Sequence, residues 1–519
     1  QNTAGGGVTL DSTTTANETV NLPTGGGNLI TTTGATFTGN IATAGISSVT
    51  AGTSNFVAGV NAGNSITSGG NYNTVVGDEA GTALTTGGQN VAVGMNAMVG
   101  QTTASYNVAV GQAALSANTT GANTTAVGWN SLTANTTGAS NTAVGSSALG
   151  ANTTGGDITA LGYNALRFNT TGGDNVAVGT EALTANTTGG QNVAVGRQSL
   201  KSNTTASNNT ALGNYSLFYN TTGGDNTAVG RSALEDNTTG SANTAVGMGS
   251  LESNTTGTLS TAIGRDALKS STTANSNTAV GREALRDTTT GGENVAIGLN
   301  AMAGNTTGPR NTAIGKQCLQ NLTTGDNNTA IGFMAGYNNN TNATTTGYGN
   351  TLIGTYAHTN AANTQYANAL GQSIGASGGY TTLGSGGSDI RASHGSTTWS
   401  TVSDERYKKD ITTSTAGLSF VNELRPVTWN YKTLGELPTT FSAYEADSTE
   451  VFKNTQTNHG FIAQEVKAVI DNHSEIKDGF KLWDDREDGS QEVAEAALIP
   501  VLVKAIQELS ARIEVLEGE

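Results

Sequence analysis

The chain has 519 residues, of which 71 are glycine, and only 12% of its residues are charged and 5% aromatic. An ordinary globular protein has about 25% charged residues and about 7% glycine. The net charge of −16 argues against a nucleic-acid partner, because phosphate binding needs clustered Lys and Arg. No apolar run reaches the length of about 18 residues that a membrane span requires.

Residues 1–55 are rich in Gly, Thr, Ala and Asn and contain short apolar pieces, such as Val8–Leu10 and Asn28–Ile30. We interpret them as a thin β-rich cap or attachment segment. It would join the chain to an anchor on a virion or on a cell surface.

A glycine then recurs at a fixed interval, and internal repeats of this kind indicate a repeat architecture. The interval is 17 residues, for example from Gly77 to Gly94; one step of 22 residues leads from Gly332 to Gly354, and Gly371 restores the 17. The regular series is Gly77, Gly94, Gly111, Gly128, Gly145, Gly162, Gly179, Gly196, Gly213, Gly230, Gly247, Gly264, Gly281, Gly298, Gly315 and Gly332.

Most units read Asn-Thr-Ala-Val-Gly-x-x-Ala-Leu-x-x-Asn-Thr-Thr-Gly, as in residues 226–240. The first five residues alternate and include β-branched types, which predicts a short strand. The Ala-Leu pair predicts a second apolar anchor, on another strand or on a single helical turn. The last residues predict a turn, because Gly supplies positive φ and Asn tolerates the left-handed region.

One unit has too few apolar side chains to bury a core alone, whereas stacked units can do so. The sequence therefore predicts a mainly β protein with a shaft of parallel β-solenoid or β-roll coils over residues 56–384. We also expect a homotrimer, on the small residues of the strands and on the family resemblances that follow. Seventeen to nineteen coils at the strand spacing of about 4.8 Å would form a rod on the order of 80–90 Å long.

We expect the Val or Ile before each glycine to point into its coil, with Ala and Gly on the opposite side of the strand. Small residues there would let another backbone approach, which suits a trimer axis. The alternative is that they only keep the strand narrow.

One asparagine position forms a ladder, and each of its members also begins an Asn-Thr-Thr glycosylation sequon. We favour a stacked amide ladder in a turn over glycosylation, because a sugar on every coil would be crowded. The members are Asn118, Asn135, Asn152, Asn169, Asn186, Asn203, Asn220, Asn237 and Asn254.

The single cysteine, Cys318, rules out an intrachain disulfide. It occupies a repeat position that is usually Ala or Ser, so we expect a small buried residue. The sequence predicts no cofactor and no metal site.

The Ala-Val-Gly and Ala-Ile-Gly strands resemble the head repeats of trimeric autotransporter adhesins. That resemblance covers residues 56–384 and implies a trimeric left-handed parallel β-roll.

Residues 385–402 read as a connector with a lone Trp399, and the composition changes after them. Residues 403–519 hold 12 Lys or Arg and 22 Asp or Glu, together with three of the five prolines, Pro426, Pro438 and Pro500. We interpret this part as a separate α+β domain.

Three segments of this domain resemble the peptidase S74 intramolecular chaperone family in the order that the family shows. They are Ser403–Ile411, Leu424–Tyr431 with its Leu-Arg-Pro-Val, and His459–Val466 with its Gly-Phe-Ile-Ala-Gln-Glu-Val. The resemblance implies a domain that directs trimerisation and then removes itself by one self-cleavage.

The same resemblance implies that Ser403 is the nucleophile and Lys408 the general base. A lysine can activate a serine once desolvation or neighbouring cations lower its pKa, and Arg406 and Lys409 are candidates for that effect. Without the family, a Ser and a Lys five residues apart would carry no weight. His459 is another active-site candidate or a structural histidine, and Asp404 and Asp410 read as turn or cap residues.

The C-terminal segment of about 492–517 shows a heptad seam of Ile at a and Leu at d. In simple parallel coils this choice favours dimers, whereas the shaft and the chaperone resemblance favour a trimer. The seam is Ile499, Leu502, Ile506, Leu509, Ile513 and Leu516.

The leading functional prediction is an extracellular virion tail fibre that binds a host cell-surface receptor, a glycan or a surface protein. The alternative is a bacterial trimeric surface adhesin with the same chaperone. A polysaccharide-degrading tailspike needs paired carboxylates, and the shaft offers only Asp78–Glu79 and Glu235–Asp236, which we expect to be solvated loop charges. Ice binding by threonine ladders is the remotest option.

Overall fold

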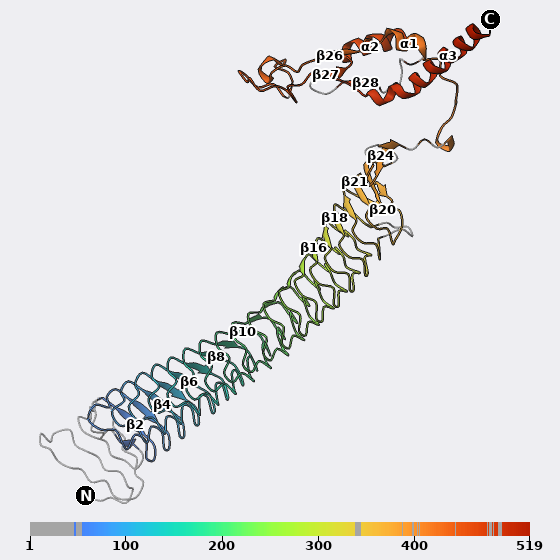
Figure 1. The fold of residues 1–519 in the computed structure, drawn as a ribbon. Coiled ribbons are helices and arrows are strands. Elements are labelled where there is room, and N and C mark those ends of the chain that lie inside the picture. Colours follow the sequence, from blue (N-terminus) through green and yellow to red (C-terminus); the bar gives the residue numbers. More distant parts are fainter. Residues whose placement is uncertain are drawn as a thin grey trace, which may run out of the picture. The chain divides into compact units, whose positions relative to one another are not determined.

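A computed structural model shows the chain as two compact units, Gln1–Val402 and Ser403–Glu519 (Figure 1). The structure describes residues 46–47, 54–337, 344–386, 388–396, 399–401, 403, 405–441, 443–474, 476, 480, 482–485 and 490–518. The expected attachment segment, residues 1–55, lies almost entirely outside the described residues. Its described part includes β1 (Ile46–Ser47), which pairs antiparallel with β2 (Phe56–Ala58).

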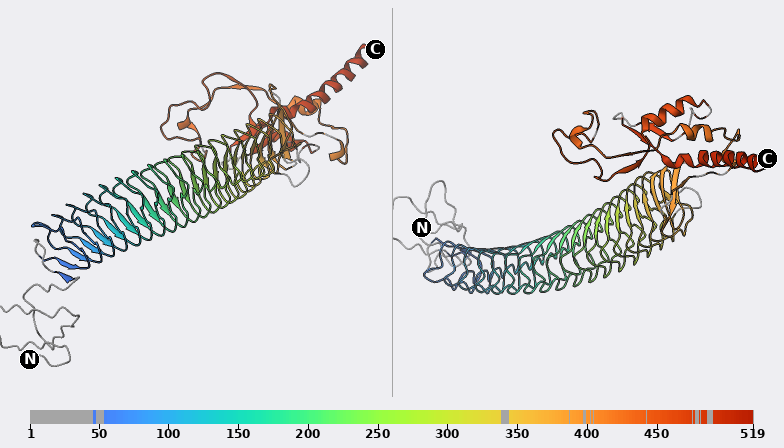
Figure 2. Two further views of the ribbon diagram at one scale, coloured as in Figure 1. Left: turned by 90° about the horizontal axis from the view of Figure 1, so that it is seen from below. Right: turned by 45° about the horizontal axis from the view of Figure 1, so that its top comes forward.

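The first unit is a stack of short parallel strands, one per coil, which bows gently along its length (Figure 2). After β2 the stacked strands are β3 (Thr74–Val76), β4 (Val91–Val93), β5 (Val108–Val110), β6 (Thr125–Val127), β7 (Thr142–Val144), β8 (Thr159–Leu161), β9 (Val176–Val178), β10 (Val193–Val195), β11 (Thr210–Leu212), β12 (Thr227–Val229), β13 (Thr244–Val246), β14 (Thr261–Ile263), β15 (Thr278–Val280), β16 (Val295–Ile297), β17 (Thr312–Ile314), β18 (Thr329–Ile331), β19 (Thr351–Ile353) and β21 (Asn368–Gln372).

Equivalent residues of successive coils pair with each other. In β12 and β13, for example, Ala228 is opposite Ala245 and Val229 is opposite Val246. The register survives the longer repeat, because Ile331 of β18 still pairs with Ile353 of β19. The predicted solenoid of stacked 17-residue coils is therefore confirmed.

The direction predicted for the strand side chains is wrong. The central residue of each stacked strand is buried and is an alanine in most coils, with Ala228 at 0% exposure, whereas the following Val, Ile or Leu faces outward and Leu212 is 47% exposed. The coil interior is narrow and already holds the leucine of each Ala-Leu pair, such as the fully buried Leu234. Only a small side chain fits opposite that leucine, so the alternation of the strand places Ala inside and Val outside.

The Ala-Leu pair lies neither on a strand nor on a helical turn. Ala233 and Leu234 belong to a run of turns in which Ser232 and Leu234 have φ of 57° and 52°. Leu234 still donates its backbone N–H to the carbonyl of Ser250 in the next coil, at 3.0 Å. Stacking therefore holds a bulky residue in a conformation that non-glycine residues rarely adopt.

The asparagine ladder of the sequons lies inside the stack. Asn152, for example, is fully buried and donates from Nδ2 to Asn135 Oδ1 at 2.8 Å and to the Gly155 carbonyl at 3.0 Å. The amide that a glycan would need is thus enclosed, which confirms the stacked-amide interpretation over glycosylation.

A second asparagine column precedes most of the strands and links successive coils by hydrogen bonds. Asn226 donates its backbone N–H to Asn209 Oδ1 at 3.0 Å and its side-chain amide to the Gly240 carbonyl at 2.9 Å. Each such residue satisfies buried backbone groups in two coils, as buried polar groups require.

Cys318 is buried in the stack, as expected. Burial raises the pKa of its thiol to about 12, so the residue is a small core side chain.

The end of the first unit is more irregular than the expected connector. Besides the two-stranded pair β20 (His358–Thr359) and β22 (Gly375–Ala376), it contains β23 (Tyr380–Ser385), β24 (Ser388–Ser393) and β25 (Ser400–Thr401). β23 pairs parallel with β21, and β24 and β25 continue the sheet in antiparallel fashion. Residues 385–402 therefore contribute strands that cover the end of the stack.

The second unit combines helices with two antiparallel strand pairs, as its sequence predicts. Its core is formed by Ala416, Phe420, Val466, Ile470, Leu482, Leu498 and Val501. Its elements are η1 (Glu405–Tyr407), α1 (Leu418–Glu423), β26 (Val427–Trp429), η2 (Leu434–Glu436), β27 (Asn458–Gly460), α2 (Ala463–Asn472), β28 (Trp483–Asp485), β29 (Gln491–Val493), η3 (Glu495–Leu498) and α3 (Ile499–Glu517). Helix α3 begins later than about residue 492, because β29 and η3 precede it.

Among the described residues, no helix is both long and apolar enough to cross a membrane.

Candidate active site

Ser403 and Lys408, the predicted nucleophile and base, lie side by side at the start of the second unit. Lys408 Nζ donates a hydrogen bond to Ser403 Oγ at 2.8 Å. Five extended residues would separate them by about 17 Å, but the 3₁₀ turn η1 reverses the chain, and Lys408 N–H donates to the Glu405 carbonyl at 2.9 Å.

Both residues of the pair are exposed in the single chain. In the geometry seen, the ammonium group of Lys408 donates to the serine oxygen. Base catalysis needs the reverse arrangement, in which a neutral lysine accepts the serine proton. The contact therefore brings the two reacting groups together, while their catalytic role stays a prediction.

The other candidates near the pair have different surroundings. Asp410 has φ of 54° in a bend, which fits the turn residue that we expected, and Asp404 lies outside the described residues. His459 lies on β27 opposite Thr428, with an exposed side chain. Within the described part of the chain, no hydrogen bond links His459 to Ser403 or Lys408.

The second and third sequence motifs meet each other in space. β26 pairs antiparallel with β27, so that Val427 is opposite Gly460. Beside this pair, Arg425 Nε donates to Glu465 Oε2 at 2.9 Å, and Arg425 Nη2 also contacts Glu465 Oε1. The hydrogen bonds from Arg425 lower the pKa of Glu465, and the carboxylate raises the pKa of Arg425.

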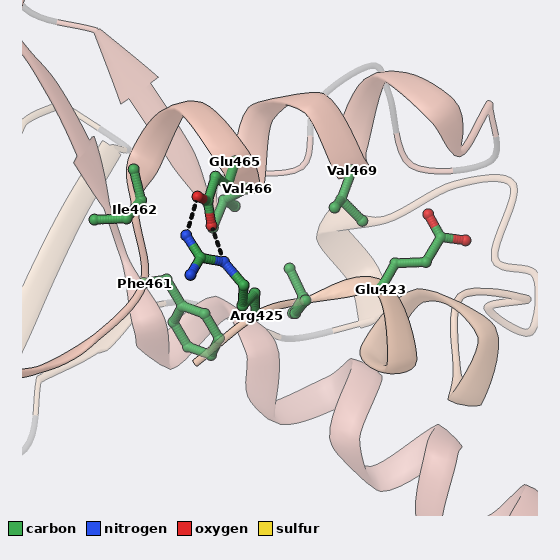
Figure 3. A pocket seen from close by; sticks show the side chains of 8 residues that line it. Glu423, Arg425, Phe461, Ile462, Glu465, Val466 and Val469 are labelled. Carbon is green, nitrogen blue, oxygen red and sulfur yellow. Dashed lines mark hydrogen bonds and ion pairs between the residues drawn. The ribbon is translucent and has the colours of Figure 1, made fainter. Parts of the chain in front are cut away.

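This ion pair spans a small pocket of about 240 Å³ (Figure 3). The remainder of the lining is mostly apolar. The lining residues are Glu423, Leu424, Arg425, Phe461, Ile462, Glu465, Val466 and Val469. The Arg425–Glu465 ion pair at this pocket thus connects the start of α2 to the segment after α1. We call this ion pair the Arg425–Glu465 clamp.

Helix α3 is attached to the unit by one of its faces. Leu498, Val501 and Ala505 are buried, and the carboxylate of Glu508 accepts the backbone N–H of Leu418 at the first turn of α1, at 2.9 Å. Supplying an acceptor to the free N–H groups of a helix start stabilises that helix.

The other face of α3 carries the predicted heptad seam, which is uncovered in the single chain. Ile506 is 64% exposed and Leu516 72%. All of the seam residues, Ile499, Leu502, Ile506, Leu509, Ile513 and Leu516, are exposed.

Neither the Arg425–Glu465 clamp nor the Glu508 contact is predicted from the sequence. A signal for the clamp was available, since each motif contains one charged residue among apolar ones. Glu508 offered none, because its partner is a backbone group 90 residues away.

The comparison with protein families finds one match. Residues 403–475 match the sequence model of Peptidase_S74, described as the chaperone of endosialidase. The matched segment starts at Ser403 and contains all three motifs, the Ser403–Lys408 pair and the Arg425–Glu465 clamp. The comparison with curated proteins gives no match, and neither does the comparison with solved structures.

Proposed function

We propose that this chain, a β-solenoid shaft followed by a segment of the endosialidase-chaperone type, is an extracellular phage-type fibre whose C-terminal unit directs trimerisation and then cleaves itself off at Ser403. One observation carries the cleavage proposal. The Ser403–Lys408 hydrogen bond of 2.8 Å lies at the first residue of both the matched segment and the second compact unit. The shaft itself would be joined to a virion and bind a host cell-surface receptor.

The proposed chemistry needs one nucleophile and one base. Ser403 Oγ attacks the carbonyl carbon of the Val402–Ser403 peptide bond, and the serine proton passes to Lys408 Nζ. The C–N bond breaks, the leaving amine takes up that proton, and the new chain end is held as an ester. Water then hydrolyses the ester to a carboxylate and restores the serine.

Assembly would switch this chemistry on. A lysine accepts a proton near neutral pH only when burial or nearby cations disfavour its charged form. Lys408 is exposed in the single chain, so neighbouring chains would have to supply the burial. Cleavage would then follow trimerisation, and its product could not reassemble its chaperone, which makes the fibre kinetically stable.

The mass of the purified full-length gene product under denaturing conditions tests the cleavage. We expect two fragments from the wild-type chain and one uncleaved mass from Ser403→Ala and from Lys408→Ala. Lys432→Ala is the matched control, since it removes an exposed lysine that lies outside the Ser403–Lys408 pair and should leave cleavage intact. The mass of the released fragment shows whether the Val402–Ser403 bond is the one that breaks. An uncleaved wild-type chain would overturn the proposal.

A further inference from the structure

The outward side of the solenoid strands from β3 to β19 forms one continuous, uncharged and mostly aliphatic surface, which Leu370 of β21 extends. Its first column consists of Thr and Val residues from Thr74 to Thr351, and its second column consists of Val, Ile and Leu. We call the two columns together the outer strand face. The second column is Val76, Val93, Val110, Val127, Val144, Leu161, Val178, Val195, Leu212, Val229, Val246, Ile263, Val280, Ile297, Ile314, Ile331, Ile353 and Leu370.

The outer strand face carries no charge, unlike the neighbouring surface. No Asp, Glu, Lys or Arg occupies either column between residues 74 and 370. The column directly after the repeat glycines is different, because it includes Asp78, Arg197, Arg231, Arg265, Arg282 and Lys316. Depletion of charge together with aliphatic side chains is typical of the buried centre of an interface.

The second column is also more exposed than a core would allow. Leu212, Ile263 and Val144 are 47%, 41% and 39% exposed, and the row continues from coil to coil. Soluble monomers rarely expose apolar patches beyond a few hundred Å². A strip of about 17 coils spaced by about 4.8 Å and about 10 Å wide covers roughly 800 Å², which equals one partner's share of a standard-size stable interface.

We infer that the outer strand face is the surface through which the shafts of three parallel copies of this chain pack together. A second copy is the occupant that fits, because only a partner with the same rise per coil keeps its aliphatic rows in step over the whole length. This inference replaces the expected axis of Ala and Gly, since the alanines fill the coil interior. It deepens the proposed trimeric assembly and rests on it.

The same periodicity explains why the shaft needs a separate seed. Sliding one copy by a single coil loses only one row of contacts, and the strand register runs unbroken through the long step between β18 and β19. The face alone therefore discriminates weakly between registers, as repetitive strands do. The aperiodic C-terminal unit, with its exposed α3 seam, would select the register.

Thiol cross-linking of the full-length chain tests the inference. In a Cys318→Ala background, Leu212→Cys or Val246→Cys places a thiol on the outer strand face. Thr239→Cys is the matched control, since it is exposed in the turn of a neighbouring coil. A trifunctional maleimide with arms that span about 10 Å, the distance between packed sheets, is added to the assembled protein, so that one reagent can join the single thiols of three chains.

We expect near-complete covalent trimer from both face variants and traces from Thr239→Cys, because thiols held across an interface react at effective concentrations of about millimolar. A trimeric protein that cross-links at Thr239 and not at Leu212 or Val246 would overturn the inference and leave the proposed trimerisation standing. A monomeric uncross-linked protein would overturn both.

Discussion

At the scale of single residues, the shaft depends on buried asparagine side chains whose amides form hydrogen bonds from one coil to the next. The sequon ladder has a gap, because Ser271 and Thr288 replace asparagine. There Asn254 Oδ1 and Ser271 Oγ are buried without a hydrogen-bond partner, and Asn305 Nδ2 reaches Thr288 Oγ1 only at 3.4 Å.

Closing the gap should stabilise the shaft. The double variant Ser271→Asn/Thr288→Asn would give Asn254 Oδ1 its donor and continue the ladder. We expect a gain of about 1–3 kcal/mol in the free energy of unfolding, read as a higher midpoint in urea denaturation. The reverse change, Asn186→Ser, should lower it. A double variant less stable than the wild type would show that the ladder is not a stabilising element.

The repeat glycines lie where the backbones of successive coils approach each other closely. Gly230 has φ of 132°, and a Cβ added there would lie 2.6 Å from the Gly247 carbonyl oxygen. Gly230→Ala should therefore destabilise the shaft by several kcal/mol, on the order of the largest point-mutation effects. Gly224→Ala is the control, because Ala139 and Ser207 occupy that column in other coils. Equal midpoints in thermal unfolding for the two variants would contradict the geometry.

We expected the Glu235–Asp236 pair to consist of solvated loop charges. Asp236 is instead partly buried. Partial burial raises its pKa, helped by the charges of Glu235 and Glu252. A carboxyl group with a raised folded pKa binds more protons in the folded state, so stability falls as pH rises through that range.

Asp236→Asn should consequently stabilise the shaft at neutral pH, by less than about 1 kcal/mol because the group is partly exposed. The gain should vanish below the ordinary carboxyl pKa. Thermal unfolding at neutral and at acid pH measures it, with Glu293→Gln as an exposed control. A gain that persists at acid pH would point to a cause other than ionisation.

At the scale of elements, helix α3 packs against the rest of its unit with one face and exposes apolar side chains on another. One face packs on α1 through Leu498, Val501 and the Glu508 contact, and the other exposes the heptad seam. Leu509→Glu would place a charge in each copy of the seam, where burial of each leucine is worth about 1.5–3 kcal/mol.

We therefore expect Leu509→Glu to leave the full-length chain monomeric and uncleaved. Gln507→Glu adds the same charge to an exposed position off the seam and should keep both assembly and cleavage. Native mass and the cleaved fraction on a denaturing gel report the two effects. A trimeric, cleaved Leu509→Glu chain would show that α3 is not the seed.

The elements also show what the sequence could and could not predict. The glycine interval was sufficient for the stacked coils, because a unit with so few apolar side chains has to stack. The glycine interval was not sufficient to predict which strand side chains point inward, since period-two alternation allows either Asn and Ala or Thr and Val inside. Hydrophobicity alone favours Val inside the coil. The interior is already filled by the leucine of each Ala-Leu pair and by the two asparagine columns, so Val lies outside.

The candidate site divides in the same way. Ser403 and Lys408 were predicted through the family motif, and their contact depends on the turn η1, which a five-residue spacing does not specify. The Arg425–Glu465 clamp required the pairing of β26 with β27, a contact between segments about 40 residues apart. Sequence spacing says nothing about such a contact.

At the scale of the whole molecule, the parts fit one sequence of events. Coils that cannot fold alone need neighbours, repetitive shafts need a register, and a C-terminal unit with an exposed apolar seam and a Ser–Lys pair can provide the register and then leave. The order of these steps is the central claim, because cleavage before assembly would discard the seed.

Native mass spectrometry of the full-length Ser403→Ala chain tests that order most directly. We expect a complex of three intact chains, assembled but unable to release the C-terminal unit. A folded, full-length monomer would contradict it.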